Sequence, residues 1–142
     1  MARRRLLPDI INKESGQSTV ELALVAMTLF MLSLFVIEVG RFSATYVMLA
    51  NSTREAAHAG SFASVTTDAP LVTAANQASP LLGTLALSNF TIAPAGTDNG
   101  GTGRTAGGTI TVTTTYSYNV LAAFNIFDAP VTLTSTAQTK VE

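Results

Sequence analysis

Cysteine is absent from this chain of 142 residues, and charged residues make up only 12% of it. Without cysteine the chain forms no disulfides, so its exported part needs no oxidising compartment. The charged fraction is about half of the quarter that is usual for soluble domains. The formal net charge of −1 gives the chain no general electrostatic footprint for nucleic acid, so we expect no nucleic-acid partner.

Side chains suited to catalysis are also scarce. His58 is the single histidine, and we interpret it as a surface or interface residue. The acids beyond residue 40 are widely scattered: Glu55, Asp68, Asp98, Asp128 and Glu142. Their spacing offers neither a nucleophile–base pair nor paired carboxylates. We therefore expect no enzyme, no cofactor, no metal site and no small-molecule substrate.

The apolar residues are concentrated in one segment. Between Leu22 and Ile37 no residue is charged, and only Thr28 and Ser33 are polar. With its flanks the segment is about twenty residues long, the length of a bilayer-spanning helix. A secretory signal peptide is the alternative, but a good A-x-A cleavage pattern occurs only at 57–59, about twenty residues too far on. The sequence therefore predicts a transmembrane helix at 17–40.

The distribution of basic residues predicts the orientation of this helix. Arginines at 3–5 and Lys13 precede it, whereas only Arg41 and Arg54 follow it closely. By the positive-inside rule, residues 1–16 form a basic cytoplasmic leader and the C-terminal region lies outside. The chain is then a single-pass membrane protein with its N-terminus in the cytoplasm.

The helical pattern continues beyond the membrane segment. Residues repeat there at three- and four-residue spacing: Val39, Phe42, Tyr46, Leu49, Thr53, Ala56 and Gly60. No proline occurs between Gln17 and Thr67. We expect one helix from about Ser18 to Phe62, roughly 65–70 Å long, in which residues 41–62 form an extracytoplasmic stalk.

A small region at 63–142 is expected to hold a second helix and a sheet. Asp68 is placed as an N-cap for a helix over Ala69–Ser79, with Pro70 in its first turn. Alternation of apolar and polar residues predicts strands at 87–94, 109–120 and 131–141. About eighty residues make a marginal core, so the sheet is expected to pack on the stalk.

The predicted fold class is α+β. It comprises a long N-terminal transmembrane and stalk helix, a short second helix, and a small three-stranded antiparallel sheet packed on the long helix. One face of the sheet is expected to be solvated and lined mostly by threonine.

A glycine-rich segment at 95–108 predicts a flexible loop. Its G-x-G-x-x-A pattern at 101–106 is followed by a strand instead of a helix, which argues against dinucleotide binding. The Asp98–Gly100 stretch lacks the further ligands of a calcium loop and is interpreted as a turn. Sequons at Asn51 and Asn89 match by pattern alone, and the sequence does not decide whether either is modified.

Two glutamates flank the apolar segment. Glu21 and Glu38 are seventeen residues apart, roughly 25 Å along a helix, close to the roughly 30 Å thickness of the hydrocarbon core. Both side chains can therefore lie near opposite interfaces at modest cost. Glu38 also has Arg41 one turn further on as an i,i+3 partner.

Glu21 has a second feature, which is its position relative to Gly16. Cleavage after Gly16 would make Gln17 the first residue and Glu21 the fifth, as in a type IV prepilin. The stretch GQSTVELALVAMTLFMLSLFVIEVGR, followed by LANSTREAAHAG, resembles the TadE/TadG-like family of Tad (Flp-type) pilus-assembly pseudopilins. The residues that carry this resemblance are Gly16, Val20, Glu21, Ala23, Leu24, Gly40, Arg41, Ala50, Arg54, Glu55, Ala56, Ala57 and Gly60.

The resemblance covers about residues 16–60, and the chain departs from the family at a few positions. Met27 and Thr28 lie where the family often has a proline, so this span is expected to be straighter. His58 stands where arginine is common, and Leu22 replaces the commoner phenylalanine.

The resemblance implies processing and assembly. A prepilin peptidase would cut after Gly16 on the cytoplasmic side, and the ammonium freed at Gln17 would pair with Glu21 of a neighbouring subunit. The implied partners are this peptidase, other pilins or pseudopilins along the apolar helix, the pilus assembly platform and inner-membrane lipid. We expect a minor pilin or pseudopilin that primes, caps or anchors a Tad-type pilus. The alternative is an unprocessed single-span protein that displays a small extracellular binding or adhesion domain.

Overall fold

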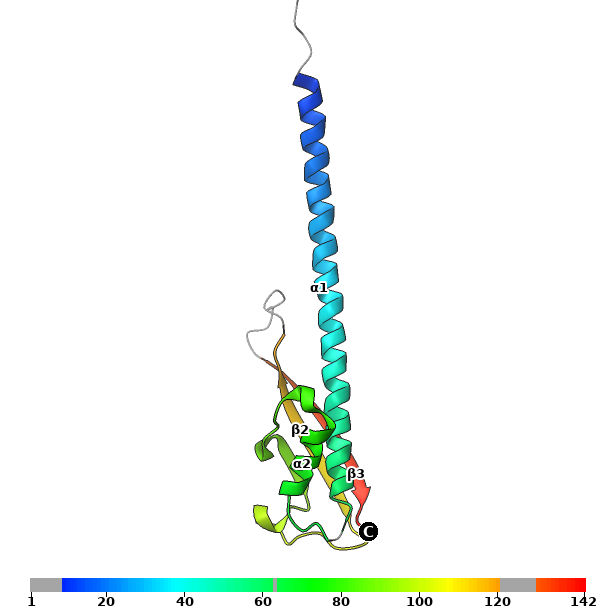
Figure 1. Cartoon of the computed structure of the whole chain (residues 1–142), viewed down its shortest axis with the longest axis vertical. Helices are drawn as coiled ribbons and strands as arrows, with labels where there is room; N and C mark the ends of the chain where they lie inside the picture. Colours follow the sequence, from blue (N-terminus) through cyan, green and yellow to red (C-terminus); the bar gives the residue numbers. More distant parts are fainter. Residues whose placement is uncertain (1–8, 63, 121–129) are drawn as a thin grey trace, which may run out of the picture. The chain divides into compact units, whose positions relative to one another are not determined.

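The computed structural model describes residues 9–62, 64–120 and 130–142 (Figure 1). Two compact units divide the chain, Met1–Val39 and Gly40–Glu142, and each is described by itself. The first holds most of a long helix. The second holds the end of that helix, a short helix and a three-stranded sheet. The α+β class predicted from the sequence is confirmed.

Helix α1 runs over Asp9–Ala59, 51 residues without interruption. It begins nine residues before the predicted Ser18, because nothing between Asp9 and Gln17 breaks a helix; a single Gly16 costs only about 1 kcal/mol. The helix ends before the predicted Phe62. Both the backbone N–H and the Oγ of Ser61 donate to the carbonyl of His58, at 3.0 and 2.7 Å, which closes the last turn.

Helix α2 covers Ala69–Ala78, close to the predicted range, with Pro70 in its first turn. Asp68 occupies the N-cap position, but the prediction that its side chain caps the helix is wrong. The carboxylate of Asp98, thirty residues further on, takes that role instead. It accepts the backbone N–H groups of Asp68 and Ala69 at 2.8 and 3.2 Å.

The sheet contains β1 (Phe90–Ala93), β2 (Thr109–Tyr118) and β3 (Val131–Lys140), antiparallel and in the order β1-β2-β3. All three predicted strands are present, with β1 shorter than predicted because Leu87–Asn89 forms a 3-10 turn, η2. In the register, Thr113 lies opposite Thr91 on one side and Thr136 on the other.

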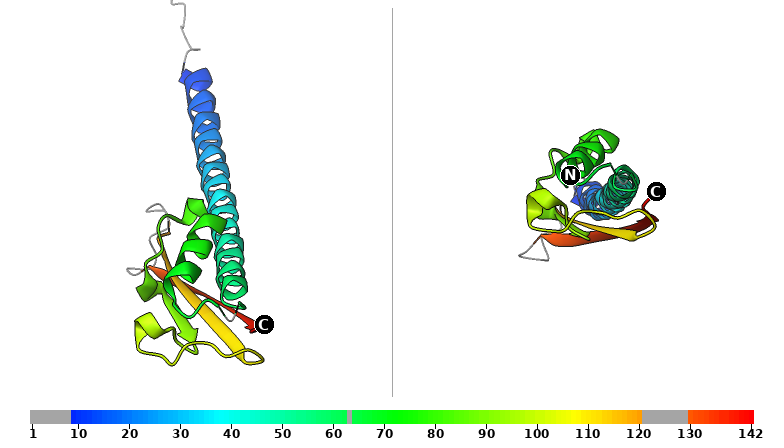
Figure 2. Two further views of the ribbon diagram at one scale, coloured as in Figure 1. Left: turned by 60° about the horizontal axis from the view of Figure 1, so that its bottom comes forward. Right: turned by 90° about the horizontal axis from the view of Figure 1, so that it is seen from below.

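The core of the second unit lies between the sheet and two helices. Helix α2 and the C-terminal part of α1 cover the same face of the sheet (Figure 2). Fully buried aliphatic side chains meet there: Leu49, Leu71, Ile110 and Val112. The opposite face presents the predicted threonines, where the hydroxyls of Thr113 and Thr136 lie 3.0 Å apart. Thr114 breaks the pattern, since it is buried on the inner face.

Side-chain hydrogen bonds fasten α1 to α2. The Oγ of Ser52, fully buried on α1, donates to the carbonyl of Ala75 at 3.1 Å. The Oγ of Ser79 donates in the other direction, to the carbonyl of Met48 at 2.7 Å. Each bond satisfies a polar group that burial would otherwise leave unpaired at a cost of about 1–3 kcal/mol.

The glycine-rich segment 95–108 is fastened to the rest of the unit by Arg104, which composition did not predict. Arg104 is 6% exposed, and its Nη1 donates to the carbonyls of Val65 and Thr67 at 2.8 and 2.9 Å. Its Nη2 pairs with the buried carboxylate of Asp68, which also accepts the backbone N–H of Gly96 at 3.0 Å. Removing either partner of this buried charge pair would leave the other charge buried and unpaired, which is strongly destabilising.

Gly60 occupies the point where α1 meets the core. A Cβ added there would lie 2.5 Å from Cδ1 of Ile110 and 3.0 Å from Cδ2 of Leu71, both fully buried. We expect Gly60→Ala to lower the free energy of unfolding by about 1–3 kcal/mol, the usual cost of overpacking. Urea unfolding of the detergent-solubilised full chain measures this.

Gly40→Ala is the matched control for this substitution. A Cβ at Gly40 meets no atom within 4 Å, and alanine is the better helix former by about 1 kcal/mol. The control should therefore lose no stability. Equal effects of the two substitutions would contradict a packing role for Gly60.

Asp98 makes the stability of the second unit depend on pH. The hydrogen bond from the backbone of Asp68 holds the pKa of this carboxyl below its usual 3.8, with smaller support from Ala69 and the charge of Arg104. Because the folded-state pKa is the lower one, the stabilisation is present above about pH 4 and is lost as the pH falls through the folded-state value. We expect Asp98→Asn to flatten the decline of Tm below about pH 4, measured by circular dichroism of the full chain.

Glu55→Gln is the control for this pH dependence. Glu55 is an exposed acid on α1 whose carboxylate makes no hydrogen bond to another described residue. The control should keep the wild-type slope. If Asp98→Asn also keeps the wild-type slope of Tm against pH, Asp98 is not the source of the pH dependence.

Candidate functional site

The first unit exposes apolar side chains on all sides of α1. Leu22, Phe30 and Val36 are 70%, 64% and 63% exposed. By length and composition, Gly16–Ala59 is the one helix in the described part of the chain that can cross a membrane. Such a surface is unstable in water, so it requires lipid or other apolar helices around it.

The polar residues inside the apolar segment are satisfied within the helix. The hydroxyl of Thr28 donates to the carbonyl of Leu24 at 2.9 Å, and that of Ser33 to the carbonyl of Leu29 at 2.8 Å. Neither hydroxyl therefore needs water. This removes the main penalty that a polar side chain faces inside a bilayer.

Gly16, Gln17 and Glu21 lie together near the start of the apolar segment. Gly16 is within α1, with no atom within 4 Å of where a Cβ would be. Gln17 and Glu21 are both exposed, and Nε2 of Gln17 donates to Oε1 of Glu21 at 3.1 Å. Residues four apart share one helix face, so the carboxylate points to the same side as residue 17.

Glu38, at the other end of the apolar segment, differs from Glu21 in its surroundings. It is only 8% exposed, whereas Glu21 is exposed. The two acids that the sequence placed symmetrically are therefore not equivalent. The i,i+3 pairing of Glu38 with Arg41 stays a prediction.

The remaining predicted site residues lie on the second unit and do not form one cluster. Gly60 is buried in the core, whereas a Cβ added at Gly40 would meet no atom within 4 Å. Arg54 and Glu55 are exposed on α1. Arg41 lies beside a tyrosine of the sheet, at a cavity that the sequence did not indicate.

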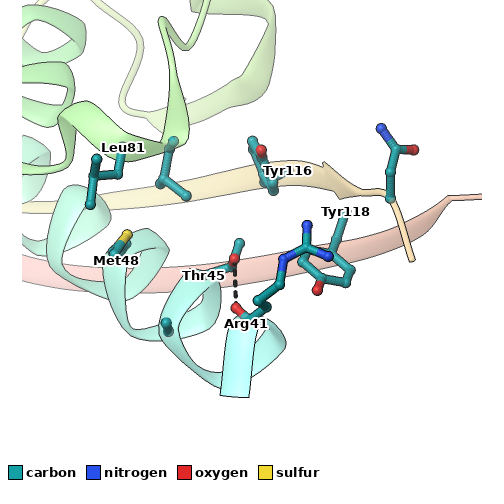
Figure 3. Close-up of a pocket in the computed structure, with 9 residues that line it drawn as sticks. Arg41, Thr45, Met48, Leu81, Tyr116 and Tyr118 are labelled. Atoms are coloured by element: carbon teal, nitrogen blue, oxygen red, sulfur yellow. Dashed lines mark hydrogen bonds between the residues drawn. The ribbon is translucent and has the colours of Figure 1, made fainter. Parts of the chain in front are cut away.

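This cavity has a volume of about 490 Å³ and lies between α1, the 3-10 turn η1 (Pro80–Leu82) and β2 (Figure 3). Its lining is part polar and part apolar: Arg41, Ala44, Thr45, Met48, Leu81, Leu82, Tyr116, Tyr118 and Asn119. The guanidinium carbon of Arg41 is 5.9 Å from the centre of the Tyr118 ring, a cation–π distance. No sequence signal could have paired Tyr118 with Arg41.

Phe42 completes the packing around Tyr118. Its ring meets the Tyr118 ring edge to face, with centroids 5.5 Å apart and planes at 89°. Tyr118 is 4% exposed as a result. The Tyr118 ring, which lines the cavity, therefore contacts both Arg41 and Phe42.

The described residues offer few side chains that could bind a metal or act as a general acid or base. No group of three His, Asp or Glu within them could hold a metal ion. His58 contacts the Phe62 ring, with ring centroids 5.6 Å apart. Its surroundings are those of a surface aromatic contact.

Comparison with known protein families gives one match, which lies on α1. The family model for TadE-like protein matches residues 16–58. No curated protein matches the chain. No solved structure matches it either. The matched segment begins at Gly16 and ends at His58, one residue before α1 ends. The family-model match confirms the resemblance of residues 16–58 to the TadE-like family, and it covers less than half of the chain. The matched residues lie within the one candidate membrane helix of the described part of the chain.

Proposed function

We propose that the chain is a minor pilin or pseudopilin that acts in assembling a Tad-type pilus, after a prepilin peptidase removes residues 1–16. One observation supports this most directly. Gly16, Gln17 and Glu21 stand at the start of the apolar segment of α1, whose apolar side chains are exposed all round, and the family match begins at Gly16. Inner-membrane anchoring, with the C-terminal unit outside, follows from the basic leader.

Processing at this position requires a local change of conformation. The bond between Gly16 and Gln17 lies inside α1, where the peptide is helical. A protease acts on an extended substrate, so this turn must unwind first. Glycine lowers the cost of unwinding, since it stabilises a helix by about 1 kcal/mol less than alanine. Gly16 is thus a point at which the helix opens.

Cleavage would create a cation that can pair with Glu21. In the intact chain the carboxylate accepts a neutral amide donor, Nε2 of Gln17. An ammonium at residue 17 of a neighbouring subunit is a stronger donor, because charge-assisted bonds are about twice as strong as neutral ones. Away from water neither charge is stable alone, so the pair would fix the axial register between helices.

The polar pair matters because the apolar surface gives little selectivity. Moving Leu22, Phe30 or Val36 from lipid to a helix bundle changes their surroundings from one apolar medium to another, so the hydrophobic driving force is small. Close packing and polar contacts must then select the partner. The proposed partners are other pilins or pseudopilins, the assembly platform and inner-membrane lipid, with a role in priming, capping or anchoring the pilus.

An unprocessed single-span protein that displays a binding or adhesion domain is the second candidate. The observation that favours it is the second unit, which has its own core of buried side chains. This function needs neither cleavage nor exchange of helix partners. The N-terminus of the purified protein separates the two.

Cleavage after Gly16 is the first prediction from this proposal. Intact-mass analysis of protein extracted from membranes should show a chain that begins at Gln17, and only in cells that contain the prepilin peptidase. Gly16→Ala should slow cleavage by about fivefold or more, because a helix stabilised by about 1 kcal/mol opens less often. Gly40→Ala makes the same change 24 residues away and should leave the rate unaltered. A chain that still begins at Met1 would contradict the proposal.

Glu21 is the subject of the second prediction. Glu21→Gln keeps the size and hydrogen-bonding capacity of the side chain but removes its charge, so insertion and cleavage should be unchanged. Incorporation into pili or pilin complexes should fall about tenfold or more, as expected when one partner of a charged bond is lost. Crosslinking or co-purification with pilin partners measures this. Normal assembly of the Glu21 variant would remove the carboxylate from the mechanism.

A further inference from the structure

Strand β3 forms one edge of the sheet, and its second side has no partner strand in the described part of the chain. The strand order is β1-β2-β3, and β3 pairs with β2 along its whole length, from Val131 to Lys140. The register of this pair runs without a bulge. An edge strand presents a row of backbone N–H and C=O groups to which another strand can bond. This free side of β3 is called the β3 edge.

Hydrogen bonds just after β3 show which of its backbone groups face the free side. The N–H of Val141 donates to the carbonyl of Gly108, and the carbonyl of Val141 accepts the N–H of Gly107, both at 2.8 Å. Backbone groups of successive residues in a strand point to alternate sides. Counting back from Val141, the odd-numbered residues of β3 bond to β2, and the even-numbered residues face away from it. The residues that present their backbone groups to the β3 edge are Thr132, Thr134, Thr136, Gln138 and Lys140, and all are exposed.

The β3 edge lacks the features that usually keep an edge strand from pairing, which are charges, proline, a bulge or a short length. Lys140, in the last position, is the only charged residue of β3, and the strand contains no proline. Its 10 residues also exceed the usual length of about five or six. The opposite edge, β1, has only 4 residues and is followed directly by Pro94. The sheet is therefore protected at β1 and open at β3.

On the side of the sheet that the helices cover, the β3 edge is bordered by apolar side chains. Val131 and Ala137 of β3 are half-buried and pack against the core. Phe42 of α1 meets the ring of Tyr118, whose register partner is Val131, yet Phe42 is 39% exposed. Tyr46, one turn further along α1, is 48% exposed. A strand added to β3 would bring alternate side chains to this side, where apolar ones would remove apolar area from water.

A second copy of the chain does not fit this edge. Within the second unit, the end of α1 and β3 run in the same direction. Phe42 contacts the register partner of Val131, and the carbonyl of Ser61 accepts the N–H of Glu142 just after β3 (Figure 1). Two β3 strands paired antiparallel would therefore direct their α1 helices in opposite ways. Two chains with the proposed anchoring in one membrane need these helices to run the same way, so the occupant is a different chain.

We infer that the β3 edge binds an extended strand of another protein, antiparallel to β3, uncharged and apolar at alternate positions. Backbone bonds to the even-numbered residues provide affinity, and side chains beside Phe42 and Tyr46 provide selectivity. Antiparallel pairing is the more stable kind per residue. The inference depends neither on cleavage nor on entry into a pilus, although the exclusion of a second copy uses the proposed membrane anchoring.

Fluorescence polarisation with the full chain in mild detergent tests this. The probe is a labelled peptide of alternating threonine and valine, as long as β3. With its valines on the helix side, the threonine N–H groups point at β3 and the valine N–H groups point away. We expect saturable binding. Methylation of the threonine nitrogens should weaken it about a hundredfold or more, because several hydrogen bonds are lost together. Methylation of the valine nitrogens should leave it unchanged.

A second peptide tests the side chains of the occupant. Serine in place of every valine keeps the backbone bonds but removes the apolar groups that would cover Phe42 and Tyr46. This peptide should bind about tenfold or more weakly than the threonine–valine peptide. Equal binding of the two would contradict the apolar character that the inference assigns to the occupant.

Thr134→Pro and Thr134→Ala are the matched variants of the chain. The N–H of Thr134 faces the free side, so proline removes no bond to β2, and edge strands tolerate proline in such a position. Thr134→Pro should weaken binding of the threonine–valine peptide about tenfold or more, because a donor is lost and the ring obstructs the approach. Thr134→Ala should leave binding unchanged. If the proline variant does not fold, the two methylated peptides decide the question on the wild-type chain.

Several outcomes would overturn the inference. Equal binding of the two methylated peptides would exclude backbone pairing, and equal binding by two folded Thr134 variants would place the peptide elsewhere. A dimer of the full chain in detergent that Thr134→Pro separates would show that a second copy occupies the edge. A chain that begins at Met1 but binds the peptide refutes processing alone, whereas one that begins at Gln17 and binds no peptide refutes the role of the β3 edge alone.

Discussion

The structure depends on a single uninterrupted helix whose side chains must satisfy two different surroundings. From Val20 to Ile37, α1 presents apolar side chains to every side, and its hydroxyls bond to its own carbonyls. From Leu49 onward it is amphipathic, with one face buried against the sheet and α2. Since the backbone hydrogen bonds of a helix are internal, the same conformation serves both surroundings. Only the side-chain pattern changes, between about Gly40 and Leu49.

The second unit shows how a small region of few charges can hold its shape without disulfides. Aliphatic side chains from both helices and the sheet form its core. Its long glycine-rich segment is then tied down by one buried arginine. Arg104 bonds to two carbonyls of 65–67 and pairs with Asp68, while Asp98 caps α2. The C-terminus closes the unit, since the backbone N–H of Glu142 donates to the carbonyl of Ser61 at 2.7 Å.

The family residues on α1 divide according to what their part of the helix does. Gly16 and Glu21 lie where the apolar surface begins, and it is there that we propose processing and helix pairing. Gly60 ends the helix inside a packed core, where no Cβ fits without displacing Ile110. The segment that resembles the family therefore includes both a proposed recognition site and a glycine that the packing of the core requires.

The sequence by itself determined the elements whose signal is local. Helix α1, α2 and the three strands follow from apolar periodicity, and the resemblance at Gly16 and Glu21 follows from spacing along one helix. The tertiary structure alone decided that Asp98 caps α2, that Asp68 pairs with Arg104, and that Tyr118 lies under Arg41. These partners are thirty or more residues apart in the chain. Periodicity and capping rules describe only residues that are a few positions apart in the sequence. Contacts between residues thirty or more positions apart form only when the loop and the sheet pack on the helices.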